Sequence, residues 1–462
     1  MGIFVHWTPA SVPGWAPVDS EIGDLLAAGD PEALAENPYT EWYQNSLRFP
    51  DSPVSRHHRA TYGTKPYAEF AEEYQAGLET WDPDDWARRF RDAGARYVVL
   101  VAKHHDGFCL WPTSVRNPHR PAGWHTQRDV VGELREAVLG VGLRFGLYYS
   151  GGLDWTFDDR PIGNLGDLLA AVPRGDYPAY ADAQVRELVA RYRPSVLWND
   201  IAWPSTGAGL WPLIADYYGA VPDGLVNDRW MPWSPAMGAA RSASVRKLVD
   251  AVNARATRSA GGLIPPKPPH FDVRTPEYMV FDDVRREPWE CVRGMDQSFG
   301  YNRNSRPEHF LAPDDLVEML ADITSKGGNL LLNVGPKGED ASIPSEQEAL
   351  LEHLGGWTAN RGGSVFESRP WVRPAGTDGR TDLRFWAAGR DVWAGVLGTA
   401  QGSFAVPGVG ATPTTVVSLS STAGDAVPVE WSESPRGLMV HLPDVDLDHP
   451  VIQLRDVTAI PV

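Results

Sequence analysis

The sequence is poor in three features that mark particular protein classes: cysteine, long apolar runs and positive charge. Only two cysteines, Cys109 and Cys291, occur in 462 residues, too few for a disulfide framework or a cysteine metal cluster. No run of about 18 apolar residues is present, so we expect no membrane-spanning helix and no membrane partner. Lysine and arginine number 42 against 60 aspartate and glutamate, a formal net charge of −18. This excess of acid argues against nucleic acid as a partner, because a polyanion would be repelled.

A signal peptide is also missing from the start of the chain. The sequence opens directly into an apolar run, Gly2 to Trp7, that is typical of a strand. A cytoplasmic location is the default expectation, although so abrupt a start suggests that an upstream segment is absent from the sequence. Localisation therefore stays unknown, and a homo-oligomer stays open.

What is present is a repeated order of apolar strand, polar loop and amphipathic helix. The length suits a barrel plus something smaller, and 42% apolar residues are enough for a full core. Eight strand-like runs predict an α/β fold, an irregular (β/α)8 TIM barrel. The runs lie at residues 2–7, 96–102, 143–150, 195–200, 224–230, 276–281, 294–301 and 329–336, and helices are predicted at 84–93, 128–139, 180–192, 244–256 and 313–325.

The character of the sequence changes after about residue 361, where helix signals stop. Short alternating runs follow, separated by Gly, Pro and Asp, which is typical of an antiparallel β-sandwich. These runs lie at 382–387, 391–397, 414–420, 437–441 and 450–455. We therefore predict two domains, a barrel over residues 1–361 and a C-terminal β-sandwich over residues 362–462.

The most informative stretch is Val-Leu-Trp-Asn-Asp-Ile-Ala-Trp-Pro at residues 196–204. It predicts a buried strand that delivers the carboxylate of Asp200 to its C-terminal end, where β/α barrels carry out their chemistry. Trp198 lies two residues earlier and so points to the same side of the strand. A broad apolar plate beside a carboxylate suits a sugar ring. The 19 tryptophans of the chain fit carbohydrate stacking too, although extra core is the plainer interpretation.

The motif Lys-His-His-Asp-Gly-Phe follows the apolar strand that ends at Ala102, and it brings four polar residues together. Adjacent histidines point to opposite sides of an extended chain, which is awkward for two ligands of one metal. We therefore interpret His104 and His105 as hydrogen-bond donors to hydroxyl groups, and we predict neither a metal nor a cofactor.

Three further positions are ambiguous from the sequence alone. Alternation along residues 143–150 turns Tyr148 inward, with Tyr149 as the alternative if the register slips by one residue. Arg229, after Asp228, is either half of a structural ion pair or a ligand for a hydroxyl or carboxylate. His6 ends the first strand and could be a core histidine.

A second carboxylate is harder to choose. Glu277 is one candidate, and Glu290 and Glu308 compete with it. An exposed glutamate is by default a solvated surface group, so spacing alone does not decide between them.

Taken together, these residues resemble the retaining α-L-fucosidases, glycoside hydrolase family 29. The resemblance runs in order from Gly2 to about Pro336. Its motifs are GIFVHW, TEWY, RYVVLVAKHHDGF, LWP, RDVVGEL, GLRFGLYYSGGLDW, VLWNDIAWP, NDRW, TPEY, SFGYNRN and SKGGNLLLNVGPKG. KHHDGF and the run that ends in Trp198-Asn199-Asp200 are highly specific together.

The resemblance implies a fucosylated glycan or glycoside as substrate, hydrolysed with retention and without a cofactor. It implies that Asp200 is the nucleophile and Glu277 the acid/base, two carboxylates that retention places about 5–5.5 Å apart. It also implies that Phe299 lies near the C6 methyl group of the sugar. The positions that match fucose contacts are His6, Glu41, Trp42, His104, His105, Tyr148, Trp198 and Arg229.

Two departures from the family pattern bear on the fit of the site. Thr8 stands where glycine is usual after His-Trp, and residues 231–270 resemble an insertion. Two other functions remain as alternatives. An α-L-galactosidase would have to accommodate a hydroxyl at C6, against which Phe299 argues because that hydroxyl would lack a partner. A non-catalytic fucose-binding barrel would not need both Asp200 and Glu277. The fucosyl linkage and the aglycone stay open.

Overall fold

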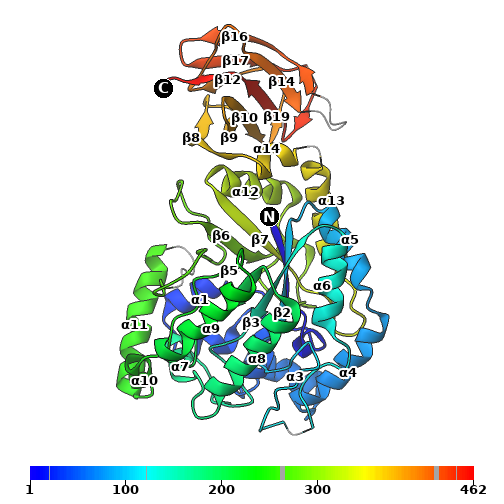
Figure 1. The fold of residues 1–462 in the computed structure, drawn as a ribbon, viewed down its shortest axis with the longest axis vertical. Coiled ribbons are helices and arrows are strands. Elements are labelled where there is room, and N and C mark those ends of the chain that lie inside the picture. The colour runs from blue at the N-terminus through cyan, green and yellow to red at the C-terminus, as the bar shows by residue number, and fades with distance from the viewer. Residues whose placement is uncertain are drawn as a thin grey trace.

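The computed structural model describes residues 1–19, 21–120, 122–260, 266–359, 361–420, 426–443 and 445–461. Figure 1 shows a large part with helices around a central sheet and, above it, a smaller part built of strands. The predicted fold class, a TIM-like barrel followed by an antiparallel β-sandwich, is confirmed.

Seven parallel strands form the central sheet, in the order β5-β4-β3-β2-β1-β7-β6. Strand β1, the fifth in this order, pairs with β2 on one side and β7 on the other, with Ile3 opposite both Val98 and Leu332. The strands read as nearly unbroken apolar runs because both faces of the sheet are covered. Their bounds are β1 Gly2–Val5, β2 Tyr97–Lys103, β3 Arg144–Tyr149, β4 Val196–Asn199, β5 Leu225–Val226, β6 Trp289–Gly294 and β7 Gly328–Val334.

The two weakest strand predictions are wrong. Residues 276–281 cannot form a ladder, since Pro276 has no N–H to donate and Tyr278 has a φ of +50°. Residues 294–301 follow β6 instead of forming a strand. A Cβ on Gly294 would lie 2.2 Å from the carbonyl oxygen of Ser298, so the chain turns back on itself there.

The gap between the two edge strands is spanned by single bridges. Val273 bridges to Asn227 beyond β5, and the next residue, Arg274, bridges to Trp289 at the start of β6. Glu277 bridges to Val292 farther along β6. Segment 273–277 therefore occupies the place of an eighth strand without forming a regular one, and it carries Glu277 to the rim of the barrel.

The predicted helices are confirmed, with ends shifted by up to four residues. They are α5 Pro83–Asp92, α6 Val130–Gly140, α8 Tyr177–Tyr192, α11 Ala243–Ala260 and α12 Pro313–Ser325. Helix α5 begins where expected because Asp82 accepts hydrogen bonds from the backbone N–H groups of Asp84 and Asp85. The other α-helices are α1 Ile22–Ala28, α2 Tyr43–Ser46, α3 Pro53–Tyr62, α4 Phe70–Gly77, α7 Leu165–Ala170, α9 Gly207–Ala220, α10 Pro235–Ala239, α13 Ser345–Thr358 and α14 Gly362–Phe366. In the parts of the chain listed above, no helix has the length and apolarity needed to cross a bilayer.

The C-terminal part packs a six-stranded sheet, β15-β14-β19-β10-β9-β8, against a three-stranded sheet, β12-β17-β16. One apolar cluster joins the two sheets, with Phe385 and Ile452 from the first and Val440 from the second. The five predicted strands correspond to β9 Asp382–Ala388, β10 Asp391–Leu397, β14 Val416–Ser420, β17 Gly437–His441 and β19 Val451–Arg455. The sequence did not reveal β8 Arg369–Thr377, β12 Ser403–Pro407, β15 Ala426–Pro428 or β16 Glu430–Ser434.

Helix α12 connects the two parts, because it lies between β7 and strands β8 and β9 (Figure 1). Trp386 donates its indole N–H to the Thr324 hydroxyl at 3.1 Å, and Arg384 pairs with Asp322 at 2.5 Å. These contacts attach the sandwich to a helix on the outside of the barrel. The domain boundary after residue 361 stays a prediction.

Candidate active site

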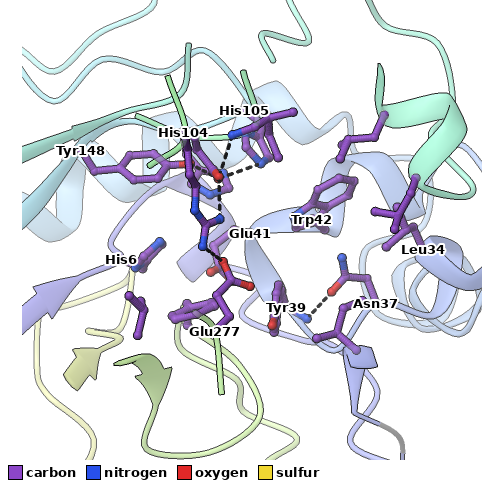
Figure 2. Close-up of a pocket in the computed structure, with 18 of the residues that line it drawn as sticks. His6, Leu34, Asn37, Tyr39, Glu41, Trp42, His104, His105, Tyr148 and Glu277 are labelled. Carbon is purple, nitrogen blue, oxygen red and sulfur yellow. Dashed lines mark hydrogen bonds and ion pairs between the residues drawn. The ribbon is translucent and has the colours of Figure 1, made fainter. Parts of the chain in front are cut away.

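A cavity of about 570 Å³ opens at the C-terminal ends of the barrel strands. Figure 2 shows part of its lining, with Tyr148, His104 and Glu277 directed toward a common space. The structure brings all the predicted site residues together in this one cavity. They are His6, Glu41, Trp42, His104, His105, Tyr148, Trp198, Asp200, Arg229, Glu277 and Phe299.

Asp200 follows β4 directly, and both of its carboxylate oxygens accept hydrogen bonds. Tyr148 donates to Oδ2 at 2.8 Å, while Arg229 Nη1 and the backbone N–H of Ile201 donate to Oδ1 at 2.9 and 2.8 Å. Ile201 has a φ of +68°, an unusual conformation for a β-branched residue. The sharp turn there ends the strand and leaves the carboxylate at the cavity wall.

Glu277 shares Arg229 with Asp200, since Nη2 of that guanidinium lies 2.6 Å from Oε1 of Glu277. Burial raises the pKa of Glu277 above its ordinary value, Arg229 opposes this, and the negative charge of Asp200 adds to it. The cavity therefore holds two carboxylates in unlike surroundings on either side of one cation. Such a difference is what separate acid and nucleophile roles require.

The two adjacent tyrosines of β3 have different partners. Tyr148 lines the cavity and bonds Asp200, whereas Tyr149 donates to Gln184 Oε1 on α8 at 2.9 Å. The inward register predicted for Tyr148 is the one observed. Tyr149 belongs to the packing between the sheet and its outer helices.

Neutral histidines line the cavity beside the carboxylates, with Nε2 of His105 3.8 Å from Oδ2 of Asp200. The Ser150 hydroxyl donates to the Leu153 carbonyl, so it must accept from Nδ1 of His105 at 2.7 Å. Asn333 donates its amide to the Phe299 carbonyl, which leaves its oxygen to accept from Nδ1 of His6 at 2.5 Å. Both rings therefore keep Nε2 unprotonated.

Burial sets the charge of this group of side chains. It lowers the pKa of His6 to about 4 and holds the pKa values of His104 and His105 well below their ordinary range. It raises the pKa of Glu41 to about 7. Near neutral pH His6 and His105 offer Nε2 as an acceptor, so the prediction that His105 donates to hydroxyl groups is wrong. Glu41 is able to carry a proton and donate one. Hydroxyl groups, which donate and accept, fit such a set.

Three of these side chains also have the spacing of metal ligands. Ligand atoms of His6, Glu41 and His104 lie within 4.8 Å of one another. A divalent cation would favour an ionised carboxylate, but the raised pKa of Glu41 favours its protonated form. The set therefore suits hydroxyl groups better than a metal, and the absence of a metal stays a prediction.

The KHHDGF motif divides between the site and its support. His104 and His105 face the cavity, whereas Lys103 is fully buried and pairs with Asp154 at 2.8 Å. Asp106 accepts a hydrogen bond from Tyr67 at 2.8 Å. The polar residues of this motif thus serve two purposes: two of them line the cavity, and the other two make buried contacts that hold the loop.

A sequence model of the family described as α-L-fucosidase matches residues 1–363, the whole barrel and the cavity. The chain belongs to the α-L-fucosidase family. Tissue α-L-fucosidase of Mus musculus is 27% identical over 452 residues, which cover 96% of this chain and 86% of that protein. An α-L-fucosidase of Branchiostoma floridae is 28% identical over 467 residues, which cover 96% of this chain and 87% of that protein.

Solved fucosidase structures extend the likeness over both domains. Thermotoga maritima α-fucosidase in complex with a mechanism-based inhibitor is 37% identical, with a TM-score of 0.80, and covers 98% of this chain and 94% of that one. The same enzyme in complex with fucose is 36% identical, with a TM-score of 0.78 and the same coverage. Both C-terminal sheets are therefore part of the shared architecture.

The competing glutamates lie elsewhere in this family member. Glu290 is buried on β6 and accepts a hydrogen bond from Tyr97, and it does not line the cavity. Glu308 is exposed on the 3-10 helix η6, Pro307–His309. Of the three candidates, Glu277 alone shares the cavity with Asp200.

The two departures from the family pattern have different consequences. Thr8 does not line the cavity, since its hydroxyl accepts from the backbone N–H of Ala10 and caps the 3-10 helix η1, Pro9–Ser11. The expectation that it bears on the site is wrong. Segment 231–270 does reach the cavity, through Met231, Asn253 and Pro266.

Sequence reasoning missed several lining residues. Phe4 lies two positions before His6 on an extended strand, so alternation could have found it. Tyr39 precedes the 3-10 helix η3, Thr40–Trp42, where that spacing gives no signal. The aliphatic residues of α1 and α7 gave no comparable signal, because an apolar residue in a helix is by default core.

Proposed function

We propose that this chain hydrolyses terminal α-L-fucosyl residues from glycans or glycosides and retains the anomeric configuration. The observation that carries the proposal is the pair of carboxylates, Asp200 and Glu277, held on one guanidinium inside a cavity that suits a sugar. The fucose complex of the Thermotoga maritima enzyme, with the same architecture, supports fucose as the sugar.

In the first step Asp200 attacks the anomeric carbon and Glu277 donates its proton to the leaving oxygen. Attack requires an ionised carboxylate, and the three donors to Asp200 stabilise that form. Proton donation requires a protonated Glu277, toward which burial moves this group. General acid help of this kind is worth about 10²–10⁴-fold.

The second step reverses the role of Glu277. Once Asp200 has become an ester it carries no charge, so its contribution to the raised pKa of Glu277 disappears. Glu277 has already given its proton to the leaving alcohol, and this lower pKa keeps it ionised until it accepts a proton from the incoming water. Charge loss at the nucleophile thus drives the switch from acid to base.

Binding of the sugar falls to the remaining residues. The neutral imidazoles of His6, His104 and His105 offer acceptors to hydroxyl groups, and Glu41 offers a donor or an acceptor. The ring centroids of Phe299 and His6 lie 5.1 Å apart, and the apolar ring of Phe299 would leave a hydroxyl at C6 without a partner. This wall favours the methyl group of fucose over the hydroxymethyl group of L-galactose.

Hydrolysis of a nitrophenyl α-L-fucoside, followed by NMR, tests the proposal. We expect turnover with α-L-fucose as the first product, much weaker turnover of the matching α-L-galactoside, and no loss of activity with EDTA. A β-anomer formed first would overturn the retaining mechanism. Tight fucose binding without turnover would support a sugar-binding barrel instead.

A further inference from the structure

Beyond the residues assigned to the sugar, much of the cavity lining is aliphatic. Side chains of α1, α7 and the segment after β5 contribute Ile22, Leu26, Leu165, Leu168, Leu169 and Met231. The three leucines of α7 are only half-buried, although they line the cavity. When a ligand covers partly exposed apolar surface, the free energy of binding becomes more favourable because water is removed from that surface.

This aliphatic wall stands outside the barrel sheet. Helix α11 packs against both α1 and α7 (Figure 1). The long segment between Arg229 and Glu277 thus supports two helices that are themselves part of the wall.

The aliphatic wall lies next to the residues that would react with the substrate. Ile201 follows Asp200 directly, and Met231 lies two residues after Arg229, both on the cavity surface. Ile22 and Glu277 line this cavity together. The leaving oxygen must sit beside Glu277, so the group attached to it starts within reach of these aliphatic side chains.

We propose that the aliphatic wall is a subsite for an apolar aglycone, so that the preferred substrates are alkyl or aryl α-L-fucosides. This inference rests on the proposed function. A sugar in the same place would press hydroxyl groups against leucine side chains and leave them without partners. Two polar residues of the lining have internal contacts, since Oδ1 of Asn37 accepts from Tyr39 N–H and Oδ1 of Asp228 accepts from Thr275.

A second cavity of about 470 Å³ offers the competing route. It shares Ile22, Tyr39 and Glu277 with the first but continues past Arg293 and Asp296. Two of its polar side chains have internal contacts, since Asp296 accepts from Ser298 N–H and Arg293 Nε donates to the Gly294 carbonyl. Oε1 of Gln297, which also lines it, is buried without a hydrogen-bond partner. A fucosylated oligosaccharide bound there is the alternative that the experiment must separate.

The test compares methyl, butyl and hexyl α-L-fucosides with a fucosylated disaccharide. The alkanols are equally poor leaving groups, so differences in kcat/KM among them report contacts of the chain. Each buried methylene should raise kcat/KM by up to about fourfold, and the hexyl fucoside should exceed the methyl fucoside by about tenfold or more. It should also exceed the disaccharide, whose leaving alcohol is the more acidic.

Two variants test whether the chain-length dependence of kcat/KM arises at the aliphatic wall. Leu168→Asn should reduce the hexyl-to-methyl ratio toward one, because it puts an amide where the chain would lie. Leu25→Asn is the matched control: Leu25 on α1 is also half-buried and packs on the same apolar cluster, but it does not line the cavity. It should keep the wild-type ratio, and thermal unfolding of both variants checks that they fold.

Each outcome decides one question. Any of three results overturns the apolar subsite: equal kcat/KM values along the alkyl series, an unchanged hexyl-to-methyl ratio in Leu168→Asn, or a higher kcat/KM for the disaccharide than for the hexyl fucoside. Turnover of methyl fucoside would still leave the proposed function standing. If the wild-type protein hydrolyses neither methyl nor nitrophenyl fucoside, the proposed function fails and the subsite fails with it.

Discussion

Nη2 of Arg229 lies 2.6 Å from Oε1 of Glu277. The other terminal nitrogen of the same guanidinium lies 2.9 Å from Asp200, so one cation contacts both carboxylates. Arg229 lowers the pKa of Glu277, which burial and Asp200 raise. The protonation state of Glu277 therefore depends on opposing effects, and replacing Arg229 removes the one that lowers its pKa.

Replacing Arg229 should move the alkaline limb of the pH profile. The reaction needs protonated Glu277, so kcat/KM on methyl α-L-fucoside falls as pH rises through its pKa. Arg229→Gln removes the charge that lowers this pKa, and the limb should shift to higher pH while kcat/KM drops roughly 10-fold or more. Arg293→Gln is the control, since Arg293 lines only the second cavity. If the alkaline limb stays at the same pH in Arg229→Gln, Arg229 does not control the pKa of Glu277.

The neighbouring tyrosines of β3 provide a matched pair. Tyr148→Phe removes a donor to Asp200 and should lower kcat roughly 10- to 100-fold with little change in melting temperature. Tyr149→Phe leaves Gln184 Oε1 without its donor and should lower the melting temperature while kcat per folded protein is kept. Steady-state kinetics and thermal unfolding separate the two, and the reverse pattern would contradict the assigned register.

Truncation of Glu277 should have effects that depend on the leaving group. A nitrophenolate departs without a proton but a sugar alkoxide does not, so Glu277→Ala should lose about 10²–10⁴-fold more on a fucosylated oligosaccharide than on nitrophenyl fucoside. Azide needs no general base, and it should speed turnover of the nitrophenyl substrate and give α-fucosyl azide. A β-azide from this variant would mean a single inversion and would contradict the covalent intermediate.

Glu290 should affect stability and not the leaving-group dependence. Burial raises its folded pKa to about 7 from 4.5, so the folded state binds more protons between these pH values. Wild-type stability is then lost as pH rises from about 4.5 to 7, by about 3 kcal/mol from this group. Glu290→Gln should reduce that loss, measured as the difference in unfolding free energy between pH 4.5 and 7.5. If Glu290→Gln instead shows the leaving-group pattern, the acid/base is Glu290.

The parts of the site that followed from the sequence lie where strand periodicity operates. Tyr148 and Trp198 were placed by counting two residues along a strand, and both line the cavity. Asp200 was placed by the abrupt end of an apolar run. Such patterns are local, so a single sequence reveals them.

What could not be predicted depends on long-range contacts. Strand β6 was missed, and strands were predicted on either side of it at 276–281 and 294–301, because β6 reads Trp-Glu-Cys-Val-Arg-Gly without a clear apolar run. The eighth barrel position has only single bridges, at residues 273–277. No pattern in the sequence marks Leu168 as a lining residue, because α1, more than a hundred residues earlier, forms the cavity beside it. The periodicity of a helix reveals that one side is apolar but not whether that side packs in the core or lines a cavity.

The most direct test of the account is to trap the glycosyl-enzyme on Asp200. With 2-deoxy-2-fluoro-α-L-fucosyl fluoride, the fluorine at C2 slows both steps and the fluoride leaving group speeds the first, so the covalent intermediate accumulates. Digestion and mass spectrometry should find one fluorofucosyl group on the peptide containing residues 196–204, attached to Asp200. A label on any other residue, or turnover of the compound to the β-anomer with no label, would contradict the proposed mechanism.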